Sequence, residues 1–219
     1  VKQELVASRV NPTRLLVEAI NGAGRNQPAV LVNGSAVGFY GCSDDAAFTE
    51  ESPAGEDFLA GLCEQWEAES RKADAAVRVV NLRTGIVLDK EGGVLGKMLP
   101  VFQLFAGGPL GKGKQWVSWI HHADLVGLIL HAIENEAVEG PLNGTAPNPC
   151  TMDGLCQALS RVLSRPNWMP VPEIALQALL GEGAMLVLEG QKVLPKKAEA
   201  TGYSFKFTDV EAALRDIMA

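Results

Sequence analysis

The alternation of apolar and polar positions predicts a strand–helix–strand unit early in the chain. Residues 29–33 and 77–82 are short, nearly continuous apolar runs, typical of strands covered on both faces of a sheet. Between them, residues 56–72 place Phe58 and Trp66 on one face of an amphipathic helix. We therefore expect the two runs to be parallel neighbours joined by a right-handed crossover.

The first segment predicts a helix with two possible starting points. Apolar residues recur at helical spacing before an Asn-Gly pair that ends the element (Leu15, Leu16, Ala19, Ile20). Asn11 and Pro12 are either the N-cap and first-turn proline, or a kink in a longer helix that begins near Lys2.

The second half of the chain predicts short helices and few strands. Helical periodicity recurs at residues 95–105, 123–135, 151–164, 173–180, 182–188 and 209–217. Residues 141–145 are typical of a short strand, and residues 203–207 alternate as a strand does. Thr208 and Glu211 form a T-x-x-E capping box for the last helix.

Composition narrows the classes of partner. A chain of 219 residues with a hydrophobic fraction of 47% can bury one large core or two smaller ones. Its net charge of −7 and pI near 5.0 argue against nucleic acid as a partner. No apolar run approaches the roughly 18 residues that a membrane span needs. The cysteines lack zinc-site spacing and are interpreted as free thiols (Cys42, Cys63, Cys150, Cys156).

Small residues after the first apolar run indicate a ligand site. Residues 35–41 read S-A-V-G-F-Y-G, a turn that lets a ligand approach the backbone closely. Ligands of open α/β sheets bind at the carboxyl ends of strands, which is where this turn lies. The sequence therefore predicts the position of a site before it predicts a chemistry.

A second segment, residues 107–125, combines glycines with two histidines and an aspartate. His121, His122 and Asp124 are either half of a metal site, a catalytic dyad, or a helix cap with His121 packed beneath Asp124. The chain has only three histidines, which favours the cap. The G-K-G-K run at residues 111–114 lacks the spacing of a phosphate loop.

Several motifs, in this order, resemble the extended short-chain dehydrogenase/reductases. They are S-A-x-G-F-Y-G, F-L-x₆-W-E at 58–67, L-R-T-G-I-V-L at 82–88, G-G-P-L-G at 107–111, W-I-H at 119–121, N-G-T-A-P at 143–147 and E-G-Q-K-V-L-P at 189–195. The chain is most similar to an atypical branch called epimerase family proteins, sometimes described as cell-division inhibitors. The resemblance runs from about residue 8 to residue 218.

This resemblance implies an α/β fold, with the C-terminal part of a Rossmann-type doubly wound parallel sheet and a smaller, mostly helical substrate domain. It implies a partial dinucleotide-binding domain over residues 1–90 and a substrate domain over 91–219, of which about 115–146 return to the sheet. Family members begin with a strand and a Gly-rich turn that binds the pyrophosphate. That fingerprint is absent from this sequence, so we expect a fragment with weak or no dinucleotide affinity.

The resemblance also implies NADP or NAD as cofactor and places the nicotinamide against Ser35, Ala36, Tyr40, Arg83, Thr84, Gly85 and Ile86. Alternatively, the Ser35 hydroxyl only caps its turn, and Tyr40 is a pocket wall. Active members use a Tyr-x₃-Lys pair, in which lysine lowers the tyrosine pKa. Alignment on Glu67 puts Leu59 and Cys63 at those positions, so no catalytic residue is predicted.

Two functions follow as expectations. One is an NAD(P)-binding epimerase or reductase that acts on an unknown small molecule. The other is a non-catalytic dinucleotide-binding module that regulates, for instance, cell or plastid division. We expect a cytoplasmic protein without a membrane span, or one in a plastid or mitochondrion if a transit peptide precedes Val1. The oligomeric state is not predicted.

Overall fold

Three parallel strands form the main sheet of the computed structural model, which describes residues 2–180 and 188–219. They lie in the order β1 (Val30–Ala36), β3 (Arg78–Thr84) and β7 (Gly140–Gly144). The register pairs Ser35 with Arg83, and Arg83 with Asn143. The predicted parallel neighbours, residues 29–33 and 77–82, are therefore confirmed.

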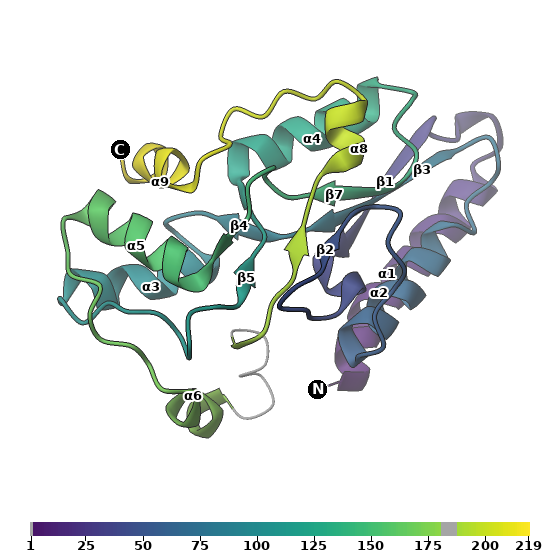
Figure 1. Ribbon diagram of the computed structural model, residues 1–219. Helices are drawn as coiled ribbons and strands as arrows, with labels where there is room; N and C mark the ends of the chain where they lie inside the picture. Colours follow the sequence, from purple (N-terminus) through teal and green to yellow (C-terminus); the bar gives the residue numbers. More distant parts are fainter. Residues whose placement is uncertain (1, 181–187) are drawn as a thin grey trace.

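Helices cover both faces of this sheet. On one face, α1 (Lys2–Gly22) and α2 (Phe58–Ser70) lie side by side, and an apolar cluster with Val17 and Leu31 joins α1 to β1 (Figure 1). On the other face, Val80 of β3 packs with residues of α4 (His122–Glu134) and α8 (Lys196–Ala200). Pro12 lies inside α1, so the helix is the longer of the two predicted alternatives.

The largest apolar core lies beside the main sheet, among three helices and short strands at the left of Figure 1. The helices are α3 (Gly93–Gln103), α5 (Met152–Leu163) and α9 (Val210–Met218). The strands are β4 (Ile86–Leu88) paired with β6 (Trp119–His121), and β5 (Trp116–Val117) paired with β8 (Cys150–Thr151). The division into two domains stays a prediction.

A segment near the end of the chain crosses between the main sheet and this core. We call residues 189–195 the strap. Its strand β9 (Lys192–Val193) pairs in parallel with β2 (Ala47–Phe48), in the middle of the view in Figure 1. The strap contacts the main sheet through Asn143 of β7 and contacts Ser118, which lies between β5 and β6. Its pairing with β2 places it beside the loop that follows β1.

Two local expectations were wrong. Residues 203–207 form no strand, because the backbone N–H groups of Lys206 and Phe207 donate to the Asp124 carboxylate. The cap of α9 is Asp209, whose side chain accepts from Ala212 N–H, while Glu211 binds arginines instead of closing a capping box.

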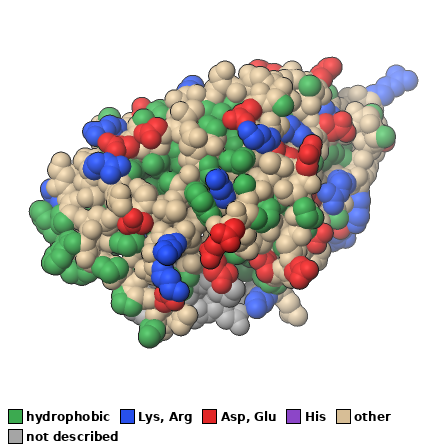
Figure 2. Space-filling view, viewed as in Figure 1, with side chains coloured by type: hydrophobic (Ala, Val, Ile, Leu, Met, Phe, Trp, Pro, Cys, Tyr) green, Lys and Arg blue, Asp and Glu red, His purple; other side chains and the backbone are tan. Residues whose placement is uncertain are grey.

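The predicted helix at 173–180 is α6 (Glu173–Leu180). The one predicted at 182–188 falls almost wholly on residues 181–187, which lie outside the described part of the chain. Among the described residues, no helix has the length and apolarity that crossing a bilayer requires. Acidic and basic side chains are interspersed over the face drawn in Figure 2.

Candidate functional site at the strand ends

The carboxyl ends of the main-sheet strands carry a row of polar residues in register. Ser35, Arg83 and Asn143 are directly paired neighbours on β1, β3 and β7. Side chains at paired positions point to the same face of a sheet, so these three converge. All three are buried, which obliges them to find partners within the protein.

An ion pair lies at the centre of this row. Arg83 Nε and Nη2 donate to the two carboxylate oxygens of Glu67 at 2.7 and 2.9 Å, and Ser35 Oγ donates to Glu67 Oε1 at 2.8 Å. Glu67 is 0% exposed and Arg83 3%, so both charges are removed from water. Burial, the largest single effect, disfavours the guanidinium, but its interactions with Glu67 and Tyr40 together outweigh this, and the pKa of Arg83 is raised.

Tyr40 extends the network toward β7. It ends a 3-10 helix, Val37–Tyr40, that directly follows β1. Its hydroxyl accepts from Arg83 Nη1 at 3.0 Å and donates to Asn143 Oδ1 at 2.6 Å. Burial raises the pKa of Tyr40 more than Arg83 lowers it, so the phenol is neutral at pH 7 and remains a donor.

Asn143 connects the network to the loop after β1 and to the strap. Its backbone N–H donates to Glu50 Oε1 at 3.0 Å, and its Nδ2 donates to the Leu194 carbonyl at 2.9 Å. The residues joined by these side-chain bonds form what we call the charged cluster: Ser35, Tyr40, Glu67, Arg83 and Asn143.

The remaining predicted site residues lie at the same strand ends and are partly exposed: Ala36, Thr84, Gly85 and Ile86. We call these four the floor residues. A Cβ added at Gly85 would lie 2.2 Å from the Ser118 carbonyl oxygen, so only glycine fits there. The backbone continues in regular contact, with Gly85 N–H donating to Gly144 O and Ile86 N–H to Ser118 O.

The structure thus brings all seven predicted cofactor residues to two adjacent strand ends. It divides them by side-chain role, however. Ser35, Tyr40 and Arg83 direct their polar atoms to one another and to Glu67 and Asn143 within the protein. The floor residues keep partial exposure. Direct contact of any of the seven with a cofactor stays a prediction.

Leu59 and Cys63, which align with the Tyr-x₃-Lys pair of active short-chain dehydrogenase/reductases, are neither an acid nor a base suited to catalysis. Leu59 lies against Gly38, with its Cβ 3.4 Å from where a Gly38 Cβ would be. Cys63 Sγ donates to the Ala36 carbonyl at 3.7 Å, and burial raises the pKa of this thiol. Both side chains therefore contact the turn after β1, and neither can move a proton near pH 7.

The histidine segment is structural in this fold. His121 caps α4, because its Nδ1 accepts from Ala123 N–H at 3.0 Å, and its ring stacks on Phe207. Asp124 is fully buried and accepts from two backbone N–H groups and the Tyr203 hydroxyl, so the expected helix cap is His121 and not Asp124. No metal-ligand cluster occurs among the described residues.

Two partners escaped the sequence reasoning as site residues. Glu67 served only as an alignment marker, and Asn143 only as part of a motif. The sequence did contain a sign that a buried polar network lies here. Strands β1 and β3 each carry two polar residues two positions apart, Asn33 with Ser35 and Asn81 with Arg83. In a strand that is otherwise apolar, this spacing puts both polar residues on one covered face.

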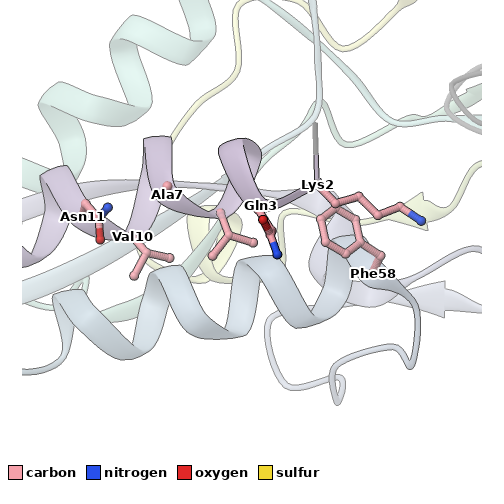
Figure 3. A pocket seen from close by; sticks show the side chains of 7 residues that line it. Lys2, Gln3, Ala7, Val10, Asn11 and Phe58 are labelled. Atoms are coloured by element: carbon pink, nitrogen blue, oxygen red, sulfur yellow. The ribbon is translucent and has the colours of Figure 1, made fainter.

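A shallow, mostly apolar groove of about 340 Å³ lies between α1 and the start of α2 (Figure 3). Its lining includes Val6, Val10 and Phe58, with Lys2 beside the Phe58 ring. No residue of the charged cluster and no floor residue lines it. The groove is therefore separate from the strand-end site.

Several proteins of known sequence are similar to this chain. A family model described as a domain of unknown function (DUF1731) matches residues 171–217. The chain is 52% identical over 219 residues to "Epimerase family protein SDR39U1 homolog, chloroplastic" of Arabidopsis thaliana, covering 100% of this chain and 63% of that protein. It is 42% identical over 221 residues to the Homo sapiens "Epimerase family protein SDR39U1", covering 100% and 75%. The chain thus spans less than two thirds of the Arabidopsis relative.

Solved structures agree. The crystal structure of human epimerase family protein SDR39U1 (isoform 2) with NADPH matches with a TM-score of 0.95 and 39% identity, over 99% of this chain and 74% of that chain. A nucleoside-diphosphate sugar epimerase from Corynebacterium glutamicum matches with a TM-score of 0.78 and 34% identity, over 99% and 43%.

Proposed function

Because this chain belongs to the epimerase family proteins represented by SDR39U1, within the short-chain dehydrogenase/reductases, we propose that its strand ends form the nicotinamide side of an NAD(P)-binding site. The observation that carries this is the likeness to the human protein crystallised with NADPH, at a TM-score of 0.95. The strand-end position supports it, since α/β sheets bind ligands there.

Each predicted residue then has a role. The floor residues (Ala36, Thr84, Gly85 and Ile86) offer backbone and small side chains to the nicotinamide ring and its ribose. Ser35, Tyr40 and Arg83 fix the backbone from beneath, through the charged cluster. NADPH has support from the human relative, while NAD is named for more distant neighbours of the same fold.

The reaction class we propose is nicotinamide-dependent redox chemistry or epimerisation of a small molecule. Leu59 and Cys63 favour a second candidate, a dinucleotide-binding regulatory module without turnover, because neither is a general acid or base at pH 7. A cytoplasmic location stays a prediction. The alternative of a plastid is supported by the word chloroplastic in the name of the Arabidopsis relative.

Ligand-observed NMR tests the proposed binding mode even at millimolar affinity. With the chain and NADPH, saturation transfer from the protein is expected to be stronger at the nicotinamide and its ribose than at the adenine. Ala36→Leu, which adds bulk at the floor, should weaken it, and the matched change at exposed Ala46, Ala46→Leu, should not. Stronger transfer to the adenine, or none to either end, would contradict the proposal.

Turnover separates the two candidates. Nicotinamide absorbance is followed with a panel of carbonyl compounds and nucleotide sugars. Oxidation or reduction above the rate of heat-denatured protein supports the enzyme, and so does epimerised product by NMR. Binding without any turnover across the panel supports the regulatory module.

A further inference from the structure

The charged cluster connects the floor residues to the strap through one hydroxyl group. Arg83 Nη1 donates to Tyr40 OH, Tyr40 OH donates to Asn143 Oδ1, and Asn143 Nδ2 donates to the Leu194 carbonyl of the strap. Arg83 is itself the residue before Thr84, the first floor residue of β3. A continuous, buried path of hydrogen bonds therefore runs from the strand ends to residues 189–195.

Backbone and side-chain contacts also hold the strap in position, among them a hydrogen bond from Thr145 Oγ1 to Val193 O at 3.3 Å. β2 and β9 are two residues each, which is too short to be stable as an isolated pair. Backbone bonds run from Ser43 N–H to Gly190 O and from Leu194 N–H to Phe48 O. Ser118 Oγ donates to Gln191 O and accepts from Val193 N–H. Side chains under the strap therefore contribute to its position together with the backbone pairing.

Tyr40 contacts the residues on either side of this path, Arg83 and Asn143, and also the short strand β2 that pairs with the strap. Its ring stacks on Phe48 of β2, with centroids 5.3 Å apart, and packs edge-on against Phe39 at 5.4 Å. Its backbone belongs to the turn that follows Ala36, a floor residue. Both the acceptor and the donor capacity of its hydroxyl are used inside the protein, which is the arrangement of a positioning group and not of an acid or base.

We propose that Tyr40 is a positioning residue that couples the nicotinamide floor to the strap, so that a ligand which orders the floor also orders residues 189–195. The coupling to a cofactor rests on the proposed function. The coupling between floor and strap does not. Linkage makes the effect reciprocal: if an ordered floor stabilises the strap by some factor, an ordered strap stabilises the ligand-bound floor by that factor, so loosening the strap weakens cofactor binding.

Tyr40→Phe tests this, because it removes only the shared hydroxyl. Amide hydrogen exchange at Ser43, Val193 and Leu194, measured without cofactor, is expected to become about fivefold to tenfold faster. Binding of NADPH is expected to weaken by no more than this factor, with the melting curve still cooperative. Unchanged exchange at all three amides would overturn the proposal.

Ser70→Ala is the matched control. This variant also loses one buried hydroxyl, which lies near Asn81 Oδ1 at 2.7 Å and near the backbone carbonyl of Glu67 in the same helix at 2.8 Å, but it contacts no side chain of the charged cluster and lies on α2 away from the strap. It should lower stability without changing strap exchange or NADPH affinity. Equal acceleration at the strap in both variants would mean general loosening and would also overturn the coupling.

If Tyr40→Phe does not fold, a second variant still tests the coupling. Phe48→Leu removes the ring that stacks on Tyr40 from the strap side, at a partly exposed position. It should accelerate exchange at Gly55, whose N–H donates to Phe39 O beside the floor, as well as at the strap. Acceleration confined to the strap contradicts the coupling. Wild-type protein that binds no NADPH contradicts the proposed function alone.

Discussion

Two polar clusters lie under the same pair of helices, two residues apart along the same strands, and they differ in charge and in reach. The neutral cluster joins α1, α2, β1 and β3 through Thr13, Asn33, Ser70 and Asn81. The charged cluster lies nearer the carboxyl ends and continues to β7 and the strap. Both are buried and hydrogen-bonded, so burial alone does not distinguish them.

The difference shows how one covered face serves two purposes. Amides and hydroxyls hold the helices on the sheet at modest cost, since neutral groups lose little on leaving water when paired. An ion pair costs far more to bury and is a poor choice for stability alone. Arg83 lies one residue before the end of β3, which agrees with the proposal that the pair positions the candidate site.

The largest effect is expected from Glu67→Gln. The amide keeps the shape of the side chain but leaves the Arg83 guanidinium buried without a counter-charge, at a cost of about 3–5 kcal/mol. Urea unfolding followed by circular dichroism measures it, with Glu64→Gln on the exposed side of the same helix as the control. A loss near that of the control would mean the pair contributes no more than a neutral contact.

An intermediate effect is expected from Asn33→Ala in the neutral cluster. This change removes the donor to Asn81 Oδ1 and the acceptor for Thr13 Oγ1, at about 1–3 kcal/mol. NADPH affinity should stay at the wild-type value, because the neutral cluster does not contact the floor residues. Weakened binding in Asn33→Ala would erase the functional distinction between the clusters.

Alkaline pH should distinguish the clusters by a smaller amount. The folded pKa of Tyr40 is raised by burial, so its contribution to stability is complete below the unfolded value of about 10 and is lost as pH rises through the folded value. From pH 9 to 11, the unfolding free energy should fall less in Tyr40→Phe than in wild type, by at most about 1.4 kcal/mol per pH unit. Asn33→Ala should parallel wild type, and a parallel Tyr40→Phe profile would contradict the argument.

The smallest effect is expected at an exposed arginine–glutamate pair. Arg161 Nε lies 2.6 Å from Glu211 Oε2, much like Arg83 and Glu67, but water screens it. Arg161→Ala should leave the urea midpoint within experimental error. A measurable loss would show that ion-pair geometry, and not burial, accounts for the effect of Glu67→Gln.

Much of the fold was predictable, because its main elements have local patterns. The apolar runs at 29–33 and 77–82 and the helices between and after them carry their own periodicity. The two- and three-residue strands do not, since β2 and β9 exist only through each other. Residues 203–207 alternate like a strand, but the carboxylate of Asp124 takes the N–H groups that a neighbouring strand would need.

The sequence predicted the position of the candidate site but not the hydrogen-bond partners of its residues. The turn that contains Ser35 and Tyr40 follows from where the first strand ends, and Arg83 was assigned by the family resemblance. That they bond to Glu67 and Asn143, and not outward, depends on helix α2 and strand β7 arriving at the same level of the sheet. The spacing of residues along one sequence does not give the distance between residues on different helices and strands. Only the polar residues at every second position of β1 and β3 indicated a buried polar network.

The pairing of β2 with β9 has a consequence for biosynthesis. A ribosome delivers roughly 5–20 residues per second, so the segment around Phe48 leaves the exit tunnel seconds before the segment that pairs with it. Contacts this distant along the chain also close slowly. During that interval β2 has no partner strand, so the backbone groups of Ala47 and Phe48 that later pair with residues 192–193 are left to water.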